Sequence, residues 1–490
     1  MDVDSKIKKK AFSGAIWKLL ERIIAQAVSL IVSIVLARLL TPEDYSVVSI
    51  VTIFFTFSDV LITGGLNTAL IQKTNADKED YSTAFWLSMI MSIFLYFVMF
   101  FCAPYISKIY DREILIPVIR VMAIILPINA AKSIVCANIS SSLNFKSFFI
   151  ATIWGTIISA FVGIIMAYNG FGAWALVVQQ MTNALVDTLL LYCRTKISFS
   201  FGISIIRFKC LWSYGWKVLV SSLIGVAYNE INPLFIGLRF SPESLSFYDK
   251  GRSFPLLISS ATTNTLSSVL FPFLSKFQNN KRELLNYTRK YISLTSYVVF
   301  PAMMGLFAVC DKFVLLLLTD KWIEIVPFIR IFCFAYMFDM INIGNCETIK
   351  AMGRSDIYLI IEIIKKICYF IVIGIFLIFA ESAITVACAS LICTVIAITV
   401  NSIPNKKLIG YSFLYQMQDL FPNFITSAFM GIFVWWIGKL IKIAVLPLLV
   451  IQVVSGILFY IFLSMIIKNK NYFILFKIIK DYFTDKKDEI

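Results

Sequence analysis

The sequence predicts an all-α, polytopic membrane protein with about fourteen transmembrane helices, and three observations support this prediction. Of the 490 residues, 59% are hydrophobic and only 15% are charged, with a mean hydropathy of +0.84. A soluble protein of this size could not bury so much apolar surface. Apolar runs reach the length of about 20 residues that a membrane span requires. Basic residues also gather in every second loop between these runs.

The apolar runs define the predicted spans, and short polar loops separate them. A total of about twelve or thirteen spans also fits the sequence. No soluble domain is inserted among them. The predicted ranges are 12–38, 45–66, 84–105, 115–139, 149–168, 172–192, 213–237, 254–275, 290–317, 326–349, 357–379, 382–402, 419–441 and 444–467.

The two halves of the chain contain similar short motifs in the same order. TPEDYS at 41–46 reappears as SPESLS at 241–246, and PVIR at 117–120 reappears as PFIR at 327–330. Displacements of roughly 200 residues indicate an internal duplication, which is common in transporters. After an even number of spans the chain returns to the side on which it began, so both copies start on the same side of the membrane. The two repeats are therefore parallel. The predicted domains are a six-helix bundle at 1–202, a second six-helix bundle at 203–405, two additional spans at 406–468 and a basic cytoplasmic tail at 469–490.

The net charge of +15 comes mainly from basic residues in particular loops between the predicted spans. Lysine and arginine gather at the N-terminus and in alternate loops, whereas acidic residues balance them in the intervening loops. This asymmetry follows the positive-inside rule and predicts that both termini are cytoplasmic. We therefore expect no nucleic-acid partner. The basic positions are Lys6, Lys8, Lys9, Lys10, Arg194, Lys196, Arg207, Lys209, Lys276, Lys281, Arg282, Lys406, Lys407 and the tail from Lys468.

Residue patterns typical of catalysis or metal binding are scarce. Histidine is absent, and the ten cysteines lie scattered without a C-x-x-C pair. The sequence contains no P-loop and no G-x-S-x-G motif. GFGAW at 170–174 is interpreted as a turn into a helix. We therefore expect no metal, no cofactor and no enzymatic activity.

Two predicted spans have a polar stripe along one helical face. Steps of three and four residues keep such side chains on one side of a helix. The first span contributes Lys18, Arg22, Gln26, Ser29 and Ser33, and the seventh contributes Lys217, Ser221, Gly225, Tyr228 and Asn232. Equivalent stripes in two repeats predict a polar cleft between them. Alternatively, Lys18 and Lys217 reach the lipid headgroups from the cytoplasmic ends of their helices.

Acidic residues within predicted spans are candidates for binding a coupling ion, because charge inside a membrane usually serves transport. Asp59 lies in mid-span among threonines and is the leading candidate, followed by Glu230 and Asp339. Such carboxylates would handle a proton or a sodium ion, since histidine is absent. Alternatively, Asp59 forms a structural pair with a base such as Arg22.

Further bases lie within predicted spans. Lys132 is deep in the fourth span and is a candidate for lining a cavity. Arg120 and Arg330 are repeat mates near the outer ends, where we expect them to anchor in the headgroups. Glu362 and Lys366 are four residues apart and are expected to neutralise one another.

Two features are expected at the first span of the second repeat. The residues from Asn229 to Pro233 should interrupt the seventh helix, because proline removes a backbone donor and bends a helix. The basic and apolar stretch 203–212 should form an amphipathic helix at the cytoplasmic interface. The tail segment 472–483 has the same composition, although a solvated connection explains it equally well.

Several loop motifs occur in a specific order and spacing. They are LARLLTPEDYS at 36–46, GLNTALIQ at 65–72, EDYSTAFW at 79–86, SLNFKSF at 142–148, GFGAWAL at 170–176 and AMGRSD at 351–356. Through them the chain resembles the polysaccharide transporters of the multidrug/oligosaccharidyl-lipid/polysaccharide exporter superfamily, the Wzx-type flippases of O-antigen, capsule and exopolysaccharide. The resemblance covers nearly the whole chain. Ser46 and Ser246 depart from the glycine that is usual in the family, which affects the geometry of the outer turns.

The resemblance implies two six-helix bundles that form a V around a cavity, which opens alternately to each side of the bacterial inner membrane. The implied substrate is an oligosaccharide linked through a diphosphate to a polyprenol lipid, and the implied protein partners are a polysaccharide polymerase and chain-length proteins. Basic side chains suit an anionic diphosphate, and hydroxyl and amide groups suit sugar. The last two spans could flank a groove for the lipid tail. The predicted substrate-binding residues are Lys18, Arg22, Gln26, Lys132, Lys217, Ser221 and Asn232.

Three alternatives differ from a flippase in what they require. A drug or cation exporter of the same superfamily would favour acidic charge in the cavity, which Asp59, Glu230 and Asp339 supply in part. A membrane polymerase or ligase would need a sizeable outer loop with catalytic groups, and the predicted outer loops are short. A non-transporting scaffold would not need buried charges on matched helical faces.

Overall fold

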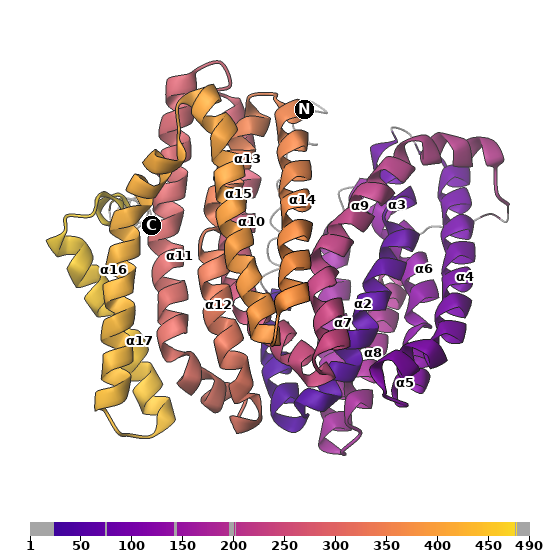
Figure 1. Cartoon of the computed structure of the whole chain (residues 1–490). Coiled ribbons are helices and arrows are strands. Elements are labelled where there is room, and N and C mark those ends of the chain that lie inside the picture. The colour runs from indigo at the N-terminus through magenta and orange to yellow at the C-terminus, as the bar shows by residue number, and fades with distance from the viewer. Residues whose placement is uncertain are drawn as a thin grey trace, which may run out of the picture. The chain divides into compact units, whose positions relative to one another are not determined.

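The computed structural model describes residues 24–73, 76–141, 145–195, 200, 202–475 and 477. All regular secondary structure in this part of the chain is helical (Figure 1). The all-α prediction is therefore confirmed. A helix satisfies its backbone hydrogen bonds within one segment, which the interior of a bilayer demands.

A helix at Ile24–Leu39 comes first among the described residues, and further helices of varied length follow it. They are α2 (Pro42–Thr63), α3 (Leu66–Gln72), α4 (Lys78–Tyr110), α5 (Leu115–Met122), α6 (Ile125–Ser141), α7 (Phe145–Tyr168), α8 (Ala173–Arg194), α9 (Ile205–Arg239), α10 (Pro242–Ser275), α11 (Lys281–Leu317), the 3₁₀ helix η1 (Asp320–Ile325), α12 (Val326–Met337), α13 (Asp339–Ala351), α14 (Ser355–Phe379), α15 (Ala383–Ile409), α16 (Phe413–Leu440) and α17 (Val445–Ile466).

The predicted spans coincide with helices wherever the structure describes them. Most match one helix, whereas 115–139 matches the pair α5 and α6, and 326–349 matches the pair α12 and α13. Within the described ranges, 9 helices are long and apolar enough to cross a membrane. The prediction of a polytopic membrane protein is confirmed, and the total of about fourteen spans stays a prediction.

Polar residues explain where two of the helices begin. The Thr41 hydroxyl accepts a hydrogen bond from the Asp44 amide at 3.2 Å, and the Asp44 carboxylate accepts one from the Thr41 amide at 2.9 Å. Pro42 occupies the first turn of α2, where its missing N–H would have no partner in any case. Asp77 and Asp80 form the same reciprocal cap at the start of α4. The first copy of the repeated motif is therefore a helix cap.

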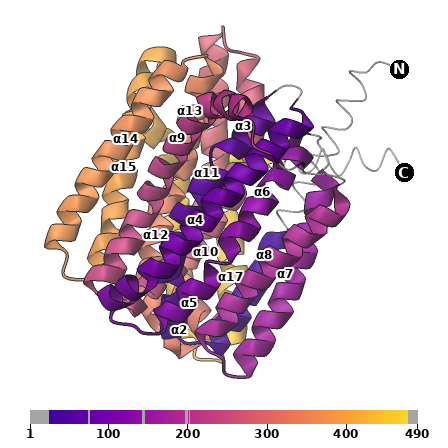
Figure 2. The same ribbon diagram turned by 90° about the vertical axis from the view of Figure 1, so that its right-hand side faces the viewer.

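Contacts divide the chain into two compact units, Met1–Ser246 and Phe247–Ile490. In the first unit, α2 packs against α4, α6, α8 and α9. Figure 2 shows α7 and α8 as neighbouring antiparallel helices of this unit. The start of α3 crosses α9 closely, since a Cβ on Gly65 would lie 2.9 Å from the carbonyl oxygen of Gly215. The bundle limits expected from the repeat stay a prediction.

In the second unit, α11 is the central helix and packs against α12, α13, α16 and α17. Polar contacts fix the last two helices to it. The Asn423 side chain of α16 donates to the Ser293 carbonyl of α11 at 2.9 Å. The Tyr297 hydroxyl of α11 donates to Ser464 Oγ of α17 at 3.0 Å. The two helices outside the predicted duplication are therefore integral to the packing of this unit.

Helix α9 differs from the expectation drawn from its sequence. It runs unbroken from Ile205 to Arg239 with Pro233 inside it, so the expected interruption at 229–233 is wrong. Proline removes one backbone donor, which a membrane helix tolerates. The amphipathic stretch 203–212 supplies the first turns of this same helix. The tail segment 472–483 lies mostly outside the described residues.

Two expectations about turns have different outcomes. Gly170 and Gly172 have φ angles of +78° and +55°, and α8 begins at Ala173. The predicted turn into a helix is confirmed, and it needs the left-handed backbone that glycine adopts readily. Ser46 and Ser246 lie in the first turns of α2 and α10 rather than in the loops. The expectation that these serines alter turn geometry is therefore wrong.

Candidate functional site

The structure describes only part of the polar stripe predicted for the first span. Lys18 and Arg22 lie outside the described residues, so their roles and the alternative pairing of Arg22 with Asp59 stay predictions. Gln26 is half-buried on the helix Ile24–Leu39.

The second predicted stripe lies on α9, and its members differ in exposure. Lys217 and Ser221 are exposed, and no atom of another described element lies within 4 Å of a Cβ built on Gly225. Glu230 is half-buried, and Asn232 is only 2% exposed. The half of the stripe nearer the start of α9 is therefore accessible to a ligand or to lipid, whereas its other end packs inside the protein.

Three helices of the first unit bring charged side chains together within their spans. Asp59 of α2 accepts a hydrogen bond from Asn129 Nδ2 of α6 at 2.9 Å. Further along α6, Lys132 forms an ion pair with Asp187 of α8. The Asp187 side chain is 7% exposed, and its Oδ1 has no hydrogen-bond partner among the described residues. These four residues, Asp59, Asn129, Lys132 and Asp187, are called the first-unit cluster below.

The first-unit cluster combines two sequence predictions that concerned different roles. Lys132 was predicted to bind substrate and Asp59 to bind a coupling ion. Because Asp187 balances its charge, Lys132 attracts a diphosphate less strongly than an unpaired base would. Asp187 was missed by the sequence analysis. It is an acidic residue within the predicted span 172–192, so the rule that charges in spans are functional would have found it.

A second polar set lies in the second unit on α10, α12 and α13. Asp339 accepts a hydrogen bond from Ser259 Oγ at 2.8 Å. Arg252 Nε donates to the Tyr336 hydroxyl at 2.8 Å. Arg252 was also missed, because the predicted span began at residue 254. Since α10 begins at Pro242, Arg252 is a helical residue rather than a loop residue.

Two ion pairs in the second unit involve residues that the sequence singled out. Arg330 contacts Asp311 at 2.8 Å, and its expected anchoring in the headgroups stays a prediction. Glu362 contacts Lys365 at 2.5 Å, so the expected pairing with Lys366 is wrong. Residues three and four apart both neighbour Glu362 on a helix, and the sequence alone does not choose between them.

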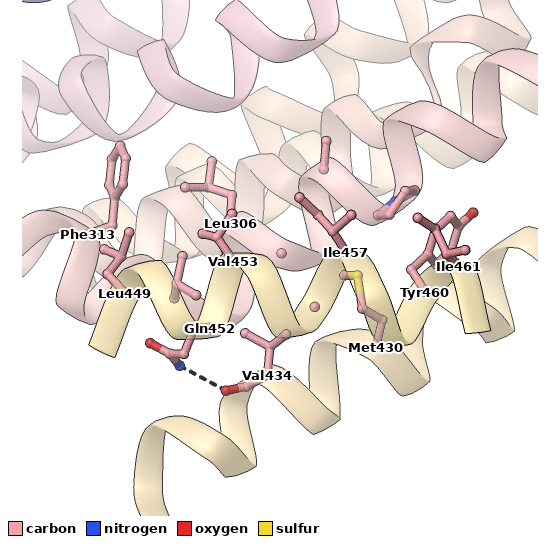
Figure 3. A pocket seen from close by; sticks show the side chains of 15 residues that line it. Leu306, Phe313, Met430, Val434, Leu449, Gln452, Val453, Ile457, Tyr460 and Ile461 are labelled. Atoms are coloured by element: carbon pink, nitrogen blue, oxygen red, sulfur yellow. Dashed lines mark hydrogen bonds between the residues drawn. The ribbon is translucent and has the colours of Figure 1, made fainter. Parts of the chain in front are cut away.

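An apolar pocket lies in the second unit between α11, α16 and α17 (Figure 3). Its volume is about 490 Å³, and its walls include Leu306, Met430 and Ile457. The Gln452 amide at its edge donates to the Val434 carbonyl at 2.8 Å. A pocket with such walls suits a hydrocarbon chain better than a sugar.

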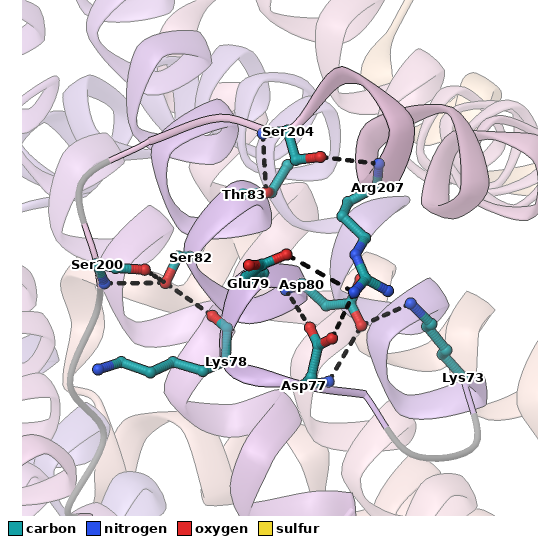
Figure 4. A network of polar contacts seen from close by, with 10 residues as sticks. All are labelled: Lys73, Asp77, Lys78, Glu79, Asp80, Ser82, Thr83, Ser200, Ser204 and Arg207. Carbon is teal, nitrogen blue, oxygen red and sulfur yellow. Dashed lines mark hydrogen bonds and ion pairs between the residues drawn. The ribbon is translucent and has the colours of Figure 1, made fainter.

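An ion-pair network ties the start of α9 to α3 and α4 (Figure 4). Arg207 Nη2 lies 2.6 Å from Asp77 Oδ2, and Lys73 Nζ lies 2.6 Å from Asp80 Oδ2. The hydrogen bond from the Asp80 amide and the nearby Arg207 guanidinium hold the pKa of Asp77 below its ordinary value. Each of the two bases of this network contacts at least one carboxylate, which fits a structural anchor.

The helical architecture defines the chain as a multi-pass membrane protein, and its fold is that of known transporters. It is similar to the solved structure of the lipid II flippase MurJ in an inward closed conformation, with a TM-score of 0.73 and 15% identity over 93% of this chain and 98% of that chain. It is also similar to an inward-facing multidrug resistance MATE family transporter, with a TM-score of 0.61 and 13% identity over 78% of this chain and 95% of that one.

The chain belongs to the family of polysaccharide biosynthesis proteins, which it matches over residues 35–327. It is 22% identical to the teichuronic acid biosynthesis protein TuaB of Bacillus subtilis (strain 168) over 470 residues, which are 93% of this chain and 95% of TuaB. It is 20% identical to the lipopolysaccharide biosynthesis protein WzxC of Escherichia coli (strain K12) over 374 residues, which are 75% and 76% of the two chains. The family resemblance inferred from the loop motifs is confirmed.

Proposed function

We propose that the protein is a flippase that moves a polyprenyl-diphosphate-linked oligosaccharide across the bacterial cytoplasmic membrane. The observation that supports this most strongly is membership of the polysaccharide biosynthesis family across residues 35–327. Similar proteins are named for teichuronic acid, for lipopolysaccharide and for flipping lipid II. Two of these names refer to the synthesis of a polysaccharide, and the third refers to moving a lipid. A glycan attached to a lipid is a substrate that fits all three names.

Three kinds of side chain suit the three parts of this substrate. Lys18, Arg22 and Lys217 would bind the diphosphate, because it is anionic. Gln26, Ser221 and Asn232 would offer hydrogen bonds to sugar. The apolar pocket between α11, α16 and α17 would receive part of the polyprenol chain. Lys132 would contribute less to binding the diphosphate, because it is paired with Asp187.

The first-unit cluster is the proposed site of ion coupling. Among the described residues, two carboxylates, Asp59 and Asp187, accompany one ammonium, Lys132. A low-dielectric environment disfavours an uncompensated charge, so this set favours uptake of a proton or a sodium ion. Asp339 and Glu230 are further candidates for the same task.

The proposed cycle is alternating access with both termini in the cytoplasm. The substrate enters from the cytoplasmic leaflet, and the glycan is released on the outer side. A polysaccharide polymerase and chain-length proteins would then use the product. The excess of basic residues in alternate loops supports this orientation.

The test is glycan export by a strain that lacks the chromosomal gene and expresses a variant. Arg22→Ala combined with Lys217→Ala should abolish export and leave lipid-linked glycan inside the cell. Lys217→Arg should retain more export than Lys217→Ala, since the charge is kept. Lys366→Ala on α14 is the matched control and should export normally. Normal export by the double variant would contradict the diphosphate site.

A multidrug or cation exporter is the second candidate, and the similarity to a MATE family transporter favours it. Asp59, Asp187 and Glu230 would attract a cationic drug. This function predicts that the chain lowers the accumulation of ethidium in cells without a glycan pathway. Ethidium uptake that is the same with and without the protein would remove this candidate.

A further inference from the structure

The structure brings both copies of the repeated motif to one arginine. TPEDYS at 41–46 begins α2, and SPESLS at 241–246 begins α10. Glu43 and Glu243 occupy the same place in the two copies. Arg112, in the turn between α4 and α5, pairs with both: Nη1 contacts Glu43 Oε1, and Nη2 contacts Glu243 Oε1.

Further hydrogen bonds hold this arrangement in place. Ser246 Oγ donates to the Pro42 carbonyl at 2.7 Å, so the two motifs also touch directly. The Arg112 amide donates to the Ser107 carbonyl at 3.0 Å, and Ser107 Oγ donates to the Arg112 carbonyl at 2.7 Å. The motif clamp is defined as Glu43, Arg112 and Glu243 together with the bond from Ser246 to Pro42. All of these residues belong to the first unit, where α10 begins.

Arg112 carries the positive charge that lies between the two carboxylates of the motif clamp. The side chains of Arg112, Glu43 and Glu243 are 24%, 63% and 32% exposed. Ion pairs with this exposure add little net stability, so they can break and form again easily. Without the guanidinium, however, two carboxylates would face each other at the starts of α2 and α10. Loss of Arg112 would therefore replace an attraction with a repulsion.

We propose that Arg112 is a positioning residue of the transport cycle, which holds the start of α10 against the start of α2 and releases it in each cycle. This inference rests on the proposed flippase function and on the predicted topology, which places these helix starts outside. The purely structural alternative is a permanent brace. The two differ because only a cycling contact changes when the substrate is present.

The experiment uses Leu245→Cys as a reporter in the full-length chain with the native cysteines replaced, because Leu245 neighbours Ser246 but makes none of the polar contacts of the motif clamp. Leu245 is 0% exposed, so an impermeant thiol reagent added outside the cell should label the new thiol slowly while the motif clamp is closed. Labelling should be several-fold faster in cells that make the lipid-linked glycan than in cells that do not. In the Arg112→Ala background, labelling should be fast both in cells that make the lipid-linked glycan and in cells that do not.

Neutralising the two acids shows whether fast labelling of Arg112→Ala results from repulsion between the carboxylates or from misfolding. Arg112→Ala with Glu43→Gln and Glu243→Gln should label slowly again, because no like charges remain. Arg112→Lys should be intermediate, since it keeps the charge but loses the fork that reaches both acids. Arg330→Ala, which breaks the pair with Asp311, is the matched control and should label as the parent does.

Three results would overturn the proposal. They are a labelling rate that Arg112→Ala does not change, fast labelling of the neutralised variant, or equal labelling of the parent with and without glycan synthesis. Glycan export is measured in the same cells. A parent that exports no glycan would contradict the proposed function, whereas normal export with unchanged labelling contradicts only the role of Arg112.

Discussion

The pairing of Lys132 with Asp187 predicts a specific stability pattern at the residue scale. Lys132→Met would leave the buried Asp187 carboxylate without its partner, which should destabilise the protein by on the order of 3 kcal/mol. Adding Asp187→Asn should recover most of this loss, because the unpaired charge is then gone. Thermal unfolding in detergent measures both variants. A Lys132→Met protein as stable as the parent would mean that the pair contributes little.

Asp59 permits a second residue-scale prediction. Asp59→Asn keeps an oxygen that can accept the hydrogen bond from Asn129, so this variant removes the charge of Asp59 and leaves its contact with α6. If Asp59 handles the coupling ion, transport in reconstituted vesicles should lose its dependence on the ion gradient while substrate binding stays normal. If Asp59 is only structural, the folded yield should fall. Unchanged ion dependence in a well-folded variant would exclude Asp59 from coupling.

At the scale of elements, the crossing of α3 and α9 depends on two glycines. A Cβ at Gly215 would lie 3.0 Å from the Gly65 carbonyl oxygen, and backbone on both sides cannot move aside easily. Gly215→Val should therefore destabilise the first unit by about 2 kcal/mol. Gly225→Ala on the same helix meets open space and should be neutral or stabilising by up to about 1 kcal/mol. Unfolding midpoints of the two variants test this contrast.

The apolar pocket gives a further prediction at this scale. A Cβ built on Gly305 of α11 would have, outside its own helix, only the Met430 methyl within 4 Å among the described residues, at 3.8 Å, so Gly305→Leu should fill the pocket without disrupting the helix. We expect lower glycan export and less crosslinking to a photoreactive polyprenyl phosphate. Gly374→Leu on α14 faces open space and serves as the matched control. Equal crosslinking of both variants would show that the lipid binds elsewhere.

At the scale of the whole molecule, the charge asymmetry predicts which side of the membrane each loop faces. Reporter fusions after residue 43 should be active outside the cell, and those after residues 205 and 480 should be active in the cytoplasm. Impermeant labelling of single cysteines at the same places provides an independent measurement. An outside location for residue 205 would reverse the proposed orientation and remove the basis for placing the motif clamp outside.

The sequence by itself determined the features that depend on neighbouring residues and on the solvent. A bilayer accepts only long apolar segments with paired backbones, so spans such as 45–66 and 149–168 were predictable from composition. The turn at 170–174 and the cap at Thr41 follow from local backbone chemistry. The order and spacing of the loop motifs, GFGAWAL at 170–176 among them, also indicated the family.

Only the tertiary structure decided which distant side chains meet, because packing between helices sets those contacts. Asp187 pairs with Lys132 although the two are far apart in sequence and lie on different helices. In the sequence, Asp111 and Glu113 flank Arg112 and offset its charge. In the structure, Arg112 instead pairs with Glu43 and Glu243. The repeat made these glutamates equivalent, but only the fold brings them to the same guanidinium. Helix periodicity fixes the face on which a charge lies, whereas its partner depends on which helix packs against that face.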